Sequence, residues 1–259
     1  MKKLTLYTFL VLMFCNVSFA EKSILKLSKD VVSGNKFYKS LNNYGTFKKY
    51  GMQVVDKKDG HPVRAGNKSI RFEVRSGDCG KSHNWNDCTT NRERHELHGR
   101  DFSGGTWWYA WSIYFPKDFI NVYPASLCLG QFHETNTETP PWMFLNDREG
   151  YSVNNMVKVP AGFQTKLLTR EQMLGKWNDI LINAKWTRKD EGFFKIWVNN
   201  NLAFDYKGPT KRKGKNYFKF GIYRSKVFKK NLPTQIVYFD EIRTGKTKEK
   251  VVGNLPPLN

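Results

Sequence analysis

The sequence predicts an all-β protein, a β-jelly roll sandwich of two antiparallel sheets with one concave face. Most segments alternate apolar and polar residues with the period of a strand, and turn signals such as Gly104-Gly105 separate them. Helical periodicity is brief, at 169–174 and in the lysine-rich segment 36–49. Aromatic residues make up 15% of the 259 residues, which supports a packed core and excludes a disordered polycation.

Eight segments carry the strand pattern. In one of them Ile70, Phe72 and Val74 alternate with Arg71 and Glu73, which is typical of a half-buried strand. The predicted strands are 69–75, 106–115, 127–133, 142–146, 179–186, 193–198, 217–223 and 235–243.

The first twenty residues are expected to lie outside this fold. Lys2 and Lys3 precede an apolar stretch, and Ser18-Phe19-Ala20 places small residues at a cleavage site. The pattern predicts a signal peptide over 1–20 and a single β-jelly roll domain over 21–259. We therefore expect a secreted or periplasmic protein that is monomeric and has no membrane contact after cleavage.

The cysteines predict a disulfide in an exported chain. Cys79 and Cys88 are close enough to close a small loop, while Cys128 is assigned to the core. One alternative is that all three are reduced and buried. A zinc site that includes His83 is less favoured because no second ligand pair follows at metal-finger spacing, so no metal is predicted.

The charge balance predicts an anionic partner. Lysine and arginine number 43 against 23 aspartate and glutamate, a formal net charge of +20. Basic runs at 207–215 and 226–230 flank the strand at 217–223 and could concentrate a polyanion there. Nucleic acid is not expected, because the chain has an export signal and no nucleic-acid-binding motif.

Two predicted strands carry polar side chains on one face. Gln131 and His133 share a face while Phe132 points to the other. In 217–223 the parity places Tyr217 and Tyr223 on the polar face together with the two residues discussed next.

Lys219 and Gly221 share that face in the same strand. Gly221 has no side chain and would leave an opening for a ligand. The segment 91–97 sets Arg92, Arg94 and Glu96 on one side, which a buried face would not accept unpaired. The alternative for these three residues is an ion-pair ladder across strands.

The segments 94–98, 131–133 and 217–225, in this order, resemble the motifs of jelly-roll polysaccharide lyases of the alginate lyase type. A wider match over 69–245 is similar to the heparin-lyase-I-like and glucuronan lyase branch and implies a concanavalin-like fold. Two departures fall where a sugar would be held. The first motif ends in His98 instead of arginine, and Arg224-Ser225 replaces asparagine and glutamine.

The resemblance implies an enzyme that cleaves a uronic-acid-containing anionic polysaccharide by β-elimination. Arg94 and Gln131 would neutralise the substrate carboxylate, because a proton beside an ionised carboxylate is otherwise hard to remove. Tyr223 would protonate the leaving oxygen, and either His133 or Tyr223 would remove the proton from C5. The residues expected to bind substrate are Arg92, Trp142, Tyr217, Lys219 and Arg224.

No cofactor is expected, although a structural Ca²⁺ ion stays open. The alternative function is a non-catalytic module of the same fold that binds anionic polysaccharide. A glycoside hydrolase would need paired carboxylates that flank the scissile bond, and the neighbouring Asp240 and Glu241 alternate between faces of one strand.

Overall fold

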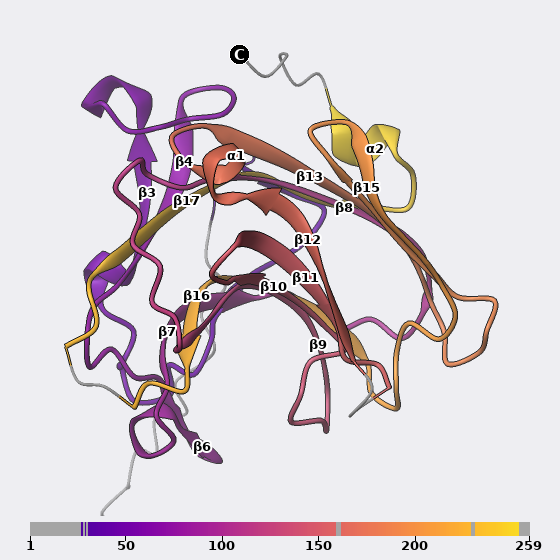
Figure 1. The fold of residues 1–259 in the computed structure, drawn as a ribbon, viewed down its shortest axis with the longest axis horizontal. Helices are drawn as coiled ribbons and strands as arrows, with labels where there is room; N and C mark the ends of the chain where they lie inside the picture. Colours follow the sequence, from indigo (N-terminus) through magenta and orange to yellow (C-terminus); the bar gives the residue numbers. More distant parts are fainter. Residues whose placement is uncertain (1–26, 28, 30, 159–161, 229–230, 254–259) are drawn as a thin grey trace, which may run out of the picture.

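Two curved sheets lie one inside the other and form an arch (Figure 1). The computed structural model describes residues 27, 29, 31–158, 162–228 and 231–253, so the predicted signal peptide lies outside the described residues. We call the eight-stranded layer the outer sheet and the seven-stranded layer the inner sheet. Apart from one short parallel pairing, neighbouring strands run antiparallel, as the sequence predicts.

The outer sheet has the strand order β15-β14-β13-β8-β17-β4-β3, and β1 pairs with β17 in parallel. Its strands are β1 (Val32–Ser33), β3 (Met52–Asp56), β4 (Lys68–Val74), β8 (Gly105–Tyr114), β13 (Trp177–Trp186), β14 (Phe193–Val198), β15 (Asn201–Lys207) and β17 (Gln235–Gly245).

The inner sheet has the order β12-β11-β10-β9-β16-β7-β2, and its outward face is concave (Figure 1). Its strands are β2 (Tyr38–Lys39), β7 (Glu93–His98), β9 (Ser126–Glu134), β10 (Trp142–Asn146), β11 (Gly150–Asn155), β12 (Phe163–Thr169) and β16 (Asn216–Ser225). A small separate ribbon pairs β5 (Lys81–Ser82) with β6 (Trp85–Asn86) beside β7.

Helices are few and short in the part of the chain that the structure describes. They are α1 (Arg170–Met173), α2 (Glu249–Val252) and the 3-10 turns η1 (Lys49–Gly51), η2 (Lys57–Asp59) and η3 (Asp87–Thr89). The helix expected at 169–174 is confirmed as α1, and a capping box formed by Thr169 and Gln172 starts it. Among the described residues, none of the helices has the length and apolar character to cross a membrane.

The helical prediction at 36–49 is wrong. This segment contains β2, which extends the inner sheet by pairing with β7, and only its last residue belongs to η1. The ring of Tyr38 stacks on His98 with centroids 5.4 Å apart, so pairing with β7 overrides the local helical pattern.

The core lies between the sheets and is built by the strand alternation. Phe218, Phe220 and Ile222 of β16 point into it and are fully buried. The ring of Trp111 on β8 stacks on Phe218 and meets the edge of Phe144 on β10, with both centroid distances 5.0 Å. Each such side chain contributes about 1.5–3 kcal/mol through burial, so this packing fixes which face of the inner sheet is left open to solvent.

Candidate active site

The polar residues predicted from the motifs come from three neighbouring strands, β7, β16 and β9. Across β16 and β7, Tyr223 lies opposite Arg94, and across β16 and β9, Lys219 lies opposite Gln131 and Tyr217 opposite His133. Their neighbours in the chain point into the core. These side chains therefore share the concave face of the inner sheet.

Glu96 is the centre of this group. Its carboxylate accepts from Gln131 Nε2 at 2.6 Å and pairs with Lys219 Nζ at 2.8 Å and Arg94 Nη1 at 3.1 Å. Glu96 is 1% exposed, and although burial alone would raise its pKa, Lys219 and Arg94 lower it below the usual value. The carboxylate is thus ionised and holds one donor from each of the three strands.

Arg94 is held from two sides. Besides Glu96, it meets Asp87, whose carboxylate accepts from Nε at 2.5 Å and from Nη2 at 2.8 Å. Burial opposes the charge, but Glu96 and Asp87 outweigh it and raise the pKa of Arg94 above its usual value. Among the described residues these two carboxylates take three of the five N–H groups of the guanidinium, which leaves two for a ligand.

Two guanidinium groups face Tyr223. Arg92 Nε donates to the hydroxyl oxygen at 2.7 Å, and Arg94 Cζ lies 4.1 Å from the ring centroid. Burial raises the pKa of Tyr223 above 10.0, while Arg94 and Arg92 act against that shift. The phenol is therefore protonated near neutral pH, and both cations would stabilise the phenolate left after proton donation.

His133 is a neutral imidazole in this setting. Its Nδ1 lies 2.8 Å from the carbonyl oxygen of Glu134, which can only accept, so Nδ1 carries the proton and Nε2 keeps a lone pair. Burial, and then the charge of Lys219, lower the pKa of His133 to about 4. The ring stacks on Tyr217 at 5.2 Å, and burial raises the pKa of that phenol to about 12.

Two residues expected to bind substrate do not reach the concave face. Trp142 is 0% exposed: its ring stacks on Phe194 at 4.0 Å and its Nε1 donates to the carbonyl oxygen of Thr210. Arg224 is also 0% exposed and pairs with Glu93 at 2.6 Å, because alternation along β16 turns it toward the core side. Neither side chain can contact a sugar, and both predictions are wrong.

Gly221 has a different role from the predicted opening. It has φ +128, and an added Cβ would lie 2.4 Å from the backbone oxygen of His95 and 2.9 Å from Cα of Glu96. The lack of a side chain therefore allows β16 to approach β7, and the space beside Gly221 is filled by the neighbouring backbone.

The disulfide between Cys79 and Cys88 is confirmed, and Cys128 is buried as a free thiol. The disulfide closes the loop 79–88, and the sequence analysis did not predict that this loop contacts the site. Asp87, inside that loop, is fully buried against Arg94. An Asp one residue before a cysteine was the only signal in the sequence, and it does not reveal which strand the carboxylate meets.

Within the described ranges, no group of three or more histidine, cysteine, aspartate and glutamate side chains is arranged to hold a metal ion. Two cavities, of about 530 and 290 Å³, lie away from the Glu96 cluster. The larger is lined by Ser103, Trp186, Thr187, Arg188, Lys189 and Lys211. A polymer at the predicted site would lie across an open curved face.

Comparison with protein families gives a match that spans most of the chain: residues 41–243 match the polysaccharide lyase family. The chain belongs to the polysaccharide lyase family. It is therefore an enzyme of the lyase class, as the motifs imply, and the curved all-β sandwich is the jelly roll expected of it. No curated protein sequence matches this lyase.

Solved structures with a similar fold include lyases and a glycoside hydrolase. An endo-β-1,4-glucuronan lyase from the fungus Trichoderma reesei is 16% identical, with a TM-score of 0.57 over 79% of this lyase and 91% of that chain. The family 7 alginate lyase A1-II' in complex with substrate is 13% identical, with a TM-score of 0.54 over 76% and 82% of the two chains.

The third structure is the catalytic domain of a glycoside hydrolase family 131 protein from Coprinopsis cinerea. It is 10% identical, with a TM-score of 0.56 over 86% of this lyase and 88% of that chain. At these identities the likeness shows the jelly-roll fold alone. The family match carries the assignment of the reaction class.

Proposed function

We propose that this lyase cleaves a uronic-acid-containing anionic polysaccharide by β-elimination on the concave face of the inner sheet. The observation that carries the proposal is the Glu96 cluster, which brings a guanidinium, an amide and an ammonium group together between a phenol and a neutral imidazole. Two solved structures of similar fold are named as a glucuronan lyase and an alginate lyase, and both of these polymers are anionic polysaccharides built of uronic acids.

The charge of the face suits a carboxylate. Arg92, Arg94 and Lys219 are cationic while Asp87 and Glu96 are anionic, so this group of five carries a surplus positive charge. The carboxylate of the sugar can be bound by the two remaining N–H groups of Arg94 and by the second amide N–H of Gln131. Binding of this kind stabilises the enolate-like charge that develops when the C5 proton leaves.

The two proton transfers need one unprotonated group and one protonated group, and His133 and Tyr223 meet these needs near neutral pH. We propose that Nε2 of His133 removes the C5 proton, because that nitrogen holds a lone pair near neutral pH. The C4–O bond then breaks, a double bond forms between C4 and C5, and Tyr223 protonates the departing O4. Each group has the required protonation state before the reaction begins.

The function is tested by incubating the purified mature protein with a panel of uronate polymers that includes glucuronan, alginate and heparin-type chains. The expected result is unsaturated oligosaccharides, detected by ultraviolet absorbance and by mass. Saturated fragments that have gained water would show hydrolysis and contradict the mechanism. Binding without any product from the whole panel would favour the non-catalytic module.

We also propose that the lyase acts outside the cytoplasm, on the basis of the predicted signal peptide at 1–20. A disulfide close to the site agrees with an oxidising compartment. The test is N-terminal sequencing of the protein recovered from the periplasm and from the medium. A mature chain that begins near Glu21 is expected, and recovery of an uncleaved chain from the cytoplasm would contradict export.

A further inference from the structure

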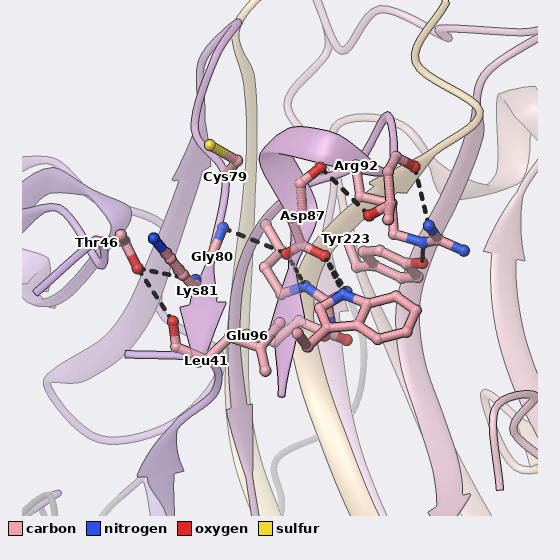
Figure 2. Close-up of polar contacts among 12 residues, drawn as sticks. Leu41, Thr46, Cys79, Gly80, Lys81, Asp87, Arg92, Glu96 and Tyr223 are labelled. Atoms are coloured by element: carbon pink, nitrogen blue, oxygen red, sulfur yellow. Dashed lines mark hydrogen bonds and ion pairs between the residues drawn. The ribbon is translucent and has the colours of Figure 1, made fainter. Parts of the chain in front are cut away.

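The loop closed by Cys79 and Cys88, residues 79–88, lies directly against the active site. Its Asp87 carboxylate accepts from the Arg94 side chain, from Trp85 Nε1 at 2.8 Å and from the Gly80 backbone N–H at 3.3 Å (Figure 2). Asp87 is fully buried, so Arg94 takes the place of water around this carboxylate.

The same loop meets the second guanidinium. The Arg92 guanidinium lies over the ring of Trp85 with Cζ 5.0 Å from its centroid, and its Nη1 donates to the carbonyl oxygen of Thr90 at 2.9 Å. The backbone N–H of Arg92 also donates to the carbonyl oxygen of Asp87 at 3.1 Å. The two cations that face Tyr223 are thus both held by 79–88 or by the turn that follows it (Figure 2).

The loop has little freedom to move as a unit. The backbone N–H of Lys81 donates to the carbonyl oxygen of Leu41 at 2.9 Å and to Thr46 Oγ1 at 3.2 Å (Figure 2). A Cβ at Gly80 would lie 2.9 Å from Leu41 Cβ and 3.1 Å from the Asp87 carboxylate, so the chain is closely packed there. The disulfide joins the two ends of the loop.

We propose that the disulfide-closed loop 79–88 positions the active site, with Asp87 fixing Arg94 and Trp85 fixing Arg92 so that both guanidinium groups face Tyr223. This inference rests on the proposed function. Asp87 acts through Arg94 and is a positioning residue, because its carboxylate points at the guanidinium. Without it, Arg94 would keep Glu96 as its one charged partner among the described residues and could rotate away from the phenol.

The central experiment replaces Asp87 with the isosteric amide, Asp87→Asn. A misplaced catalytic guanidinium costs on the order of 100-fold in rate, so kcat should fall by about that factor, and KM should rise because Arg94 also holds the substrate carboxylate in the ground state. Tyr223 is faced by Arg92, Arg94 and Glu96, and Arg94 is the neighbouring charge that lowers the pKa of the phenol most. A guanidinium that rotates away would raise this pKa, so the alkaline limb of the pH profile should move to higher pH.

The matched control is Asp240→Asn. Asp240 is also a fully buried aspartate, but it lies on β17 in the outer sheet and accepts from the backbone N–H groups of Arg64, Ala65 and Glu241. It should leave kcat and the alkaline limb unchanged at a temperature where both variants are folded. Equal losses in both variants with an unmoved limb would show general destabilisation and overturn the positioning role.

The role of the disulfide is tested with the Cys79→Ser/Cys88→Ser protein and with reduction of the wild type. Both should lower kcat by a similar factor, reoxidation of the wild type should restore it, and the serine variant should not respond to reductant. Full activity in the folded, reduced wild type would overturn the part assigned to the disulfide.

A separate readout distinguishes failure of this inference from failure of the proposed function. Hydrogen exchange at Arg94 Nε, followed by nitrogen-15 NMR, should be slow in the wild type and fast in Asp87→Asn, whatever the substrate. If no polymer yields product but exchange behaves as expected, the function fails and the positioning contact stands. Equal exchange in both proteins overturns the contact.

Discussion

Glu96 is a single carboxylate that three strands share, and its contacts make a clear prediction about stability. Glu96→Gln leaves Lys219 and Arg94 buried beside an amide, and loss of one partner from a buried ion pair costs about 3–5 kcal/mol. Urea unfolding should show this loss. Glu149→Gln is the control, because its exposed pair with Lys166 should contribute less than about 1 kcal/mol. Similar losses of unfolding free energy in the two variants would contradict a buried ion-pair cluster centred on Glu96.

Tyr223→Phe removes only the hydroxyl that would protonate the leaving oxygen. General acid catalysis contributes about 10²–10⁴-fold, so kcat should fall by a factor in that range while polymer binding persists. The measurements are product absorbance and binding of the polymer to the inactive variant. Tyr114→Phe, on β8 of the outer sheet, should keep full activity. A Tyr223→Phe enzyme with normal turnover would remove this residue from the mechanism.

The protonation states of His133 and Tyr223 predict the pH profile. A base works when unprotonated, so activity should be lost only as pH falls through about 4. An acid works when protonated, and the pKa of Tyr223 is raised above 10.0, so activity should persist until pH exceeds that value. The profile of kcat/KM against pH should be flat between these limits. A steady rise toward alkaline pH would instead show that Tyr223 performs both steps as a phenolate.

The motifs identified most of the residues on the concave face, because strand parity alone separates Gln131 and His133 from Phe132. Strand parity could not show that the prediction for Trp142 was wrong. Trp142 has a strand pattern that suits either face, and only its stacking on Phe194 in the other sheet decides that it is buried. Asp87 was missed because it lies in the disulfide-closed loop and not on a strand, so strand parity says nothing about its contact with Arg94.

At the scale of the strands, the eight predicted segments all form, with ends that shift by a few residues at most. The segment 91–97 forms as β7. The sequence analysis missed β3, β11, β12 and β15, together with the two-residue strands β1, β5 and β6 and with β2, where it expected a helix. β15 and β3 end the outer sheet and β12 ends the inner sheet, where one side of a strand has no partner and polar residues are tolerated. The alternation of these three edge strands is therefore weak, and pairing with a neighbour decides their structure.

Gly221 carries a prediction about how β16 meets β7. Gly221→Ala would place a methyl group against the backbone oxygen of His95 and force a φ that other residues rarely adopt. The backbone strain alone costs about 1–3 kcal/mol, and the strand must shift where Tyr223 faces Arg94. Thermal unfolding and kcat should both fall. Gly60→Ala, at a positive φ with nothing within 4 Å, is the control and should lose stability but not activity.

At the scale of the whole molecule, the net charge of +20 predicts that polymer binding depends on salt. KM for a uronate polymer should rise as ionic strength increases from about 0.05 to 0.5 M. Lys213→Gln/Lys215→Gln removes two exposed charges just before β16 and should weaken this dependence.

The control for this salt effect is Lys57→Gln/Lys58→Gln, which removes the same charge from η2 at the other sheet. It should change the salt dependence less than the pair near β16. Equal effects would show that net charge acts without regard to position, and a KM that ignores salt would contradict electrostatic attraction. The second basic run, 226–230, includes residues 229–230, which lie outside the described residues.

The order of the inner sheet has a consequence for biosynthesis. β16 lies between β7 and β9, although it is made more than eighty residues after them. Once residues up to Glu134 have left the ribosome, Arg94 on β7 and Gln131 and His133 on β9 have been made. The strand β16, which lies between β7 and β9 and pairs with both, is still missing. The nascent chain therefore cannot degrade polysaccharide until β16 has been made, and truncated products that end before Asn216 should be inert.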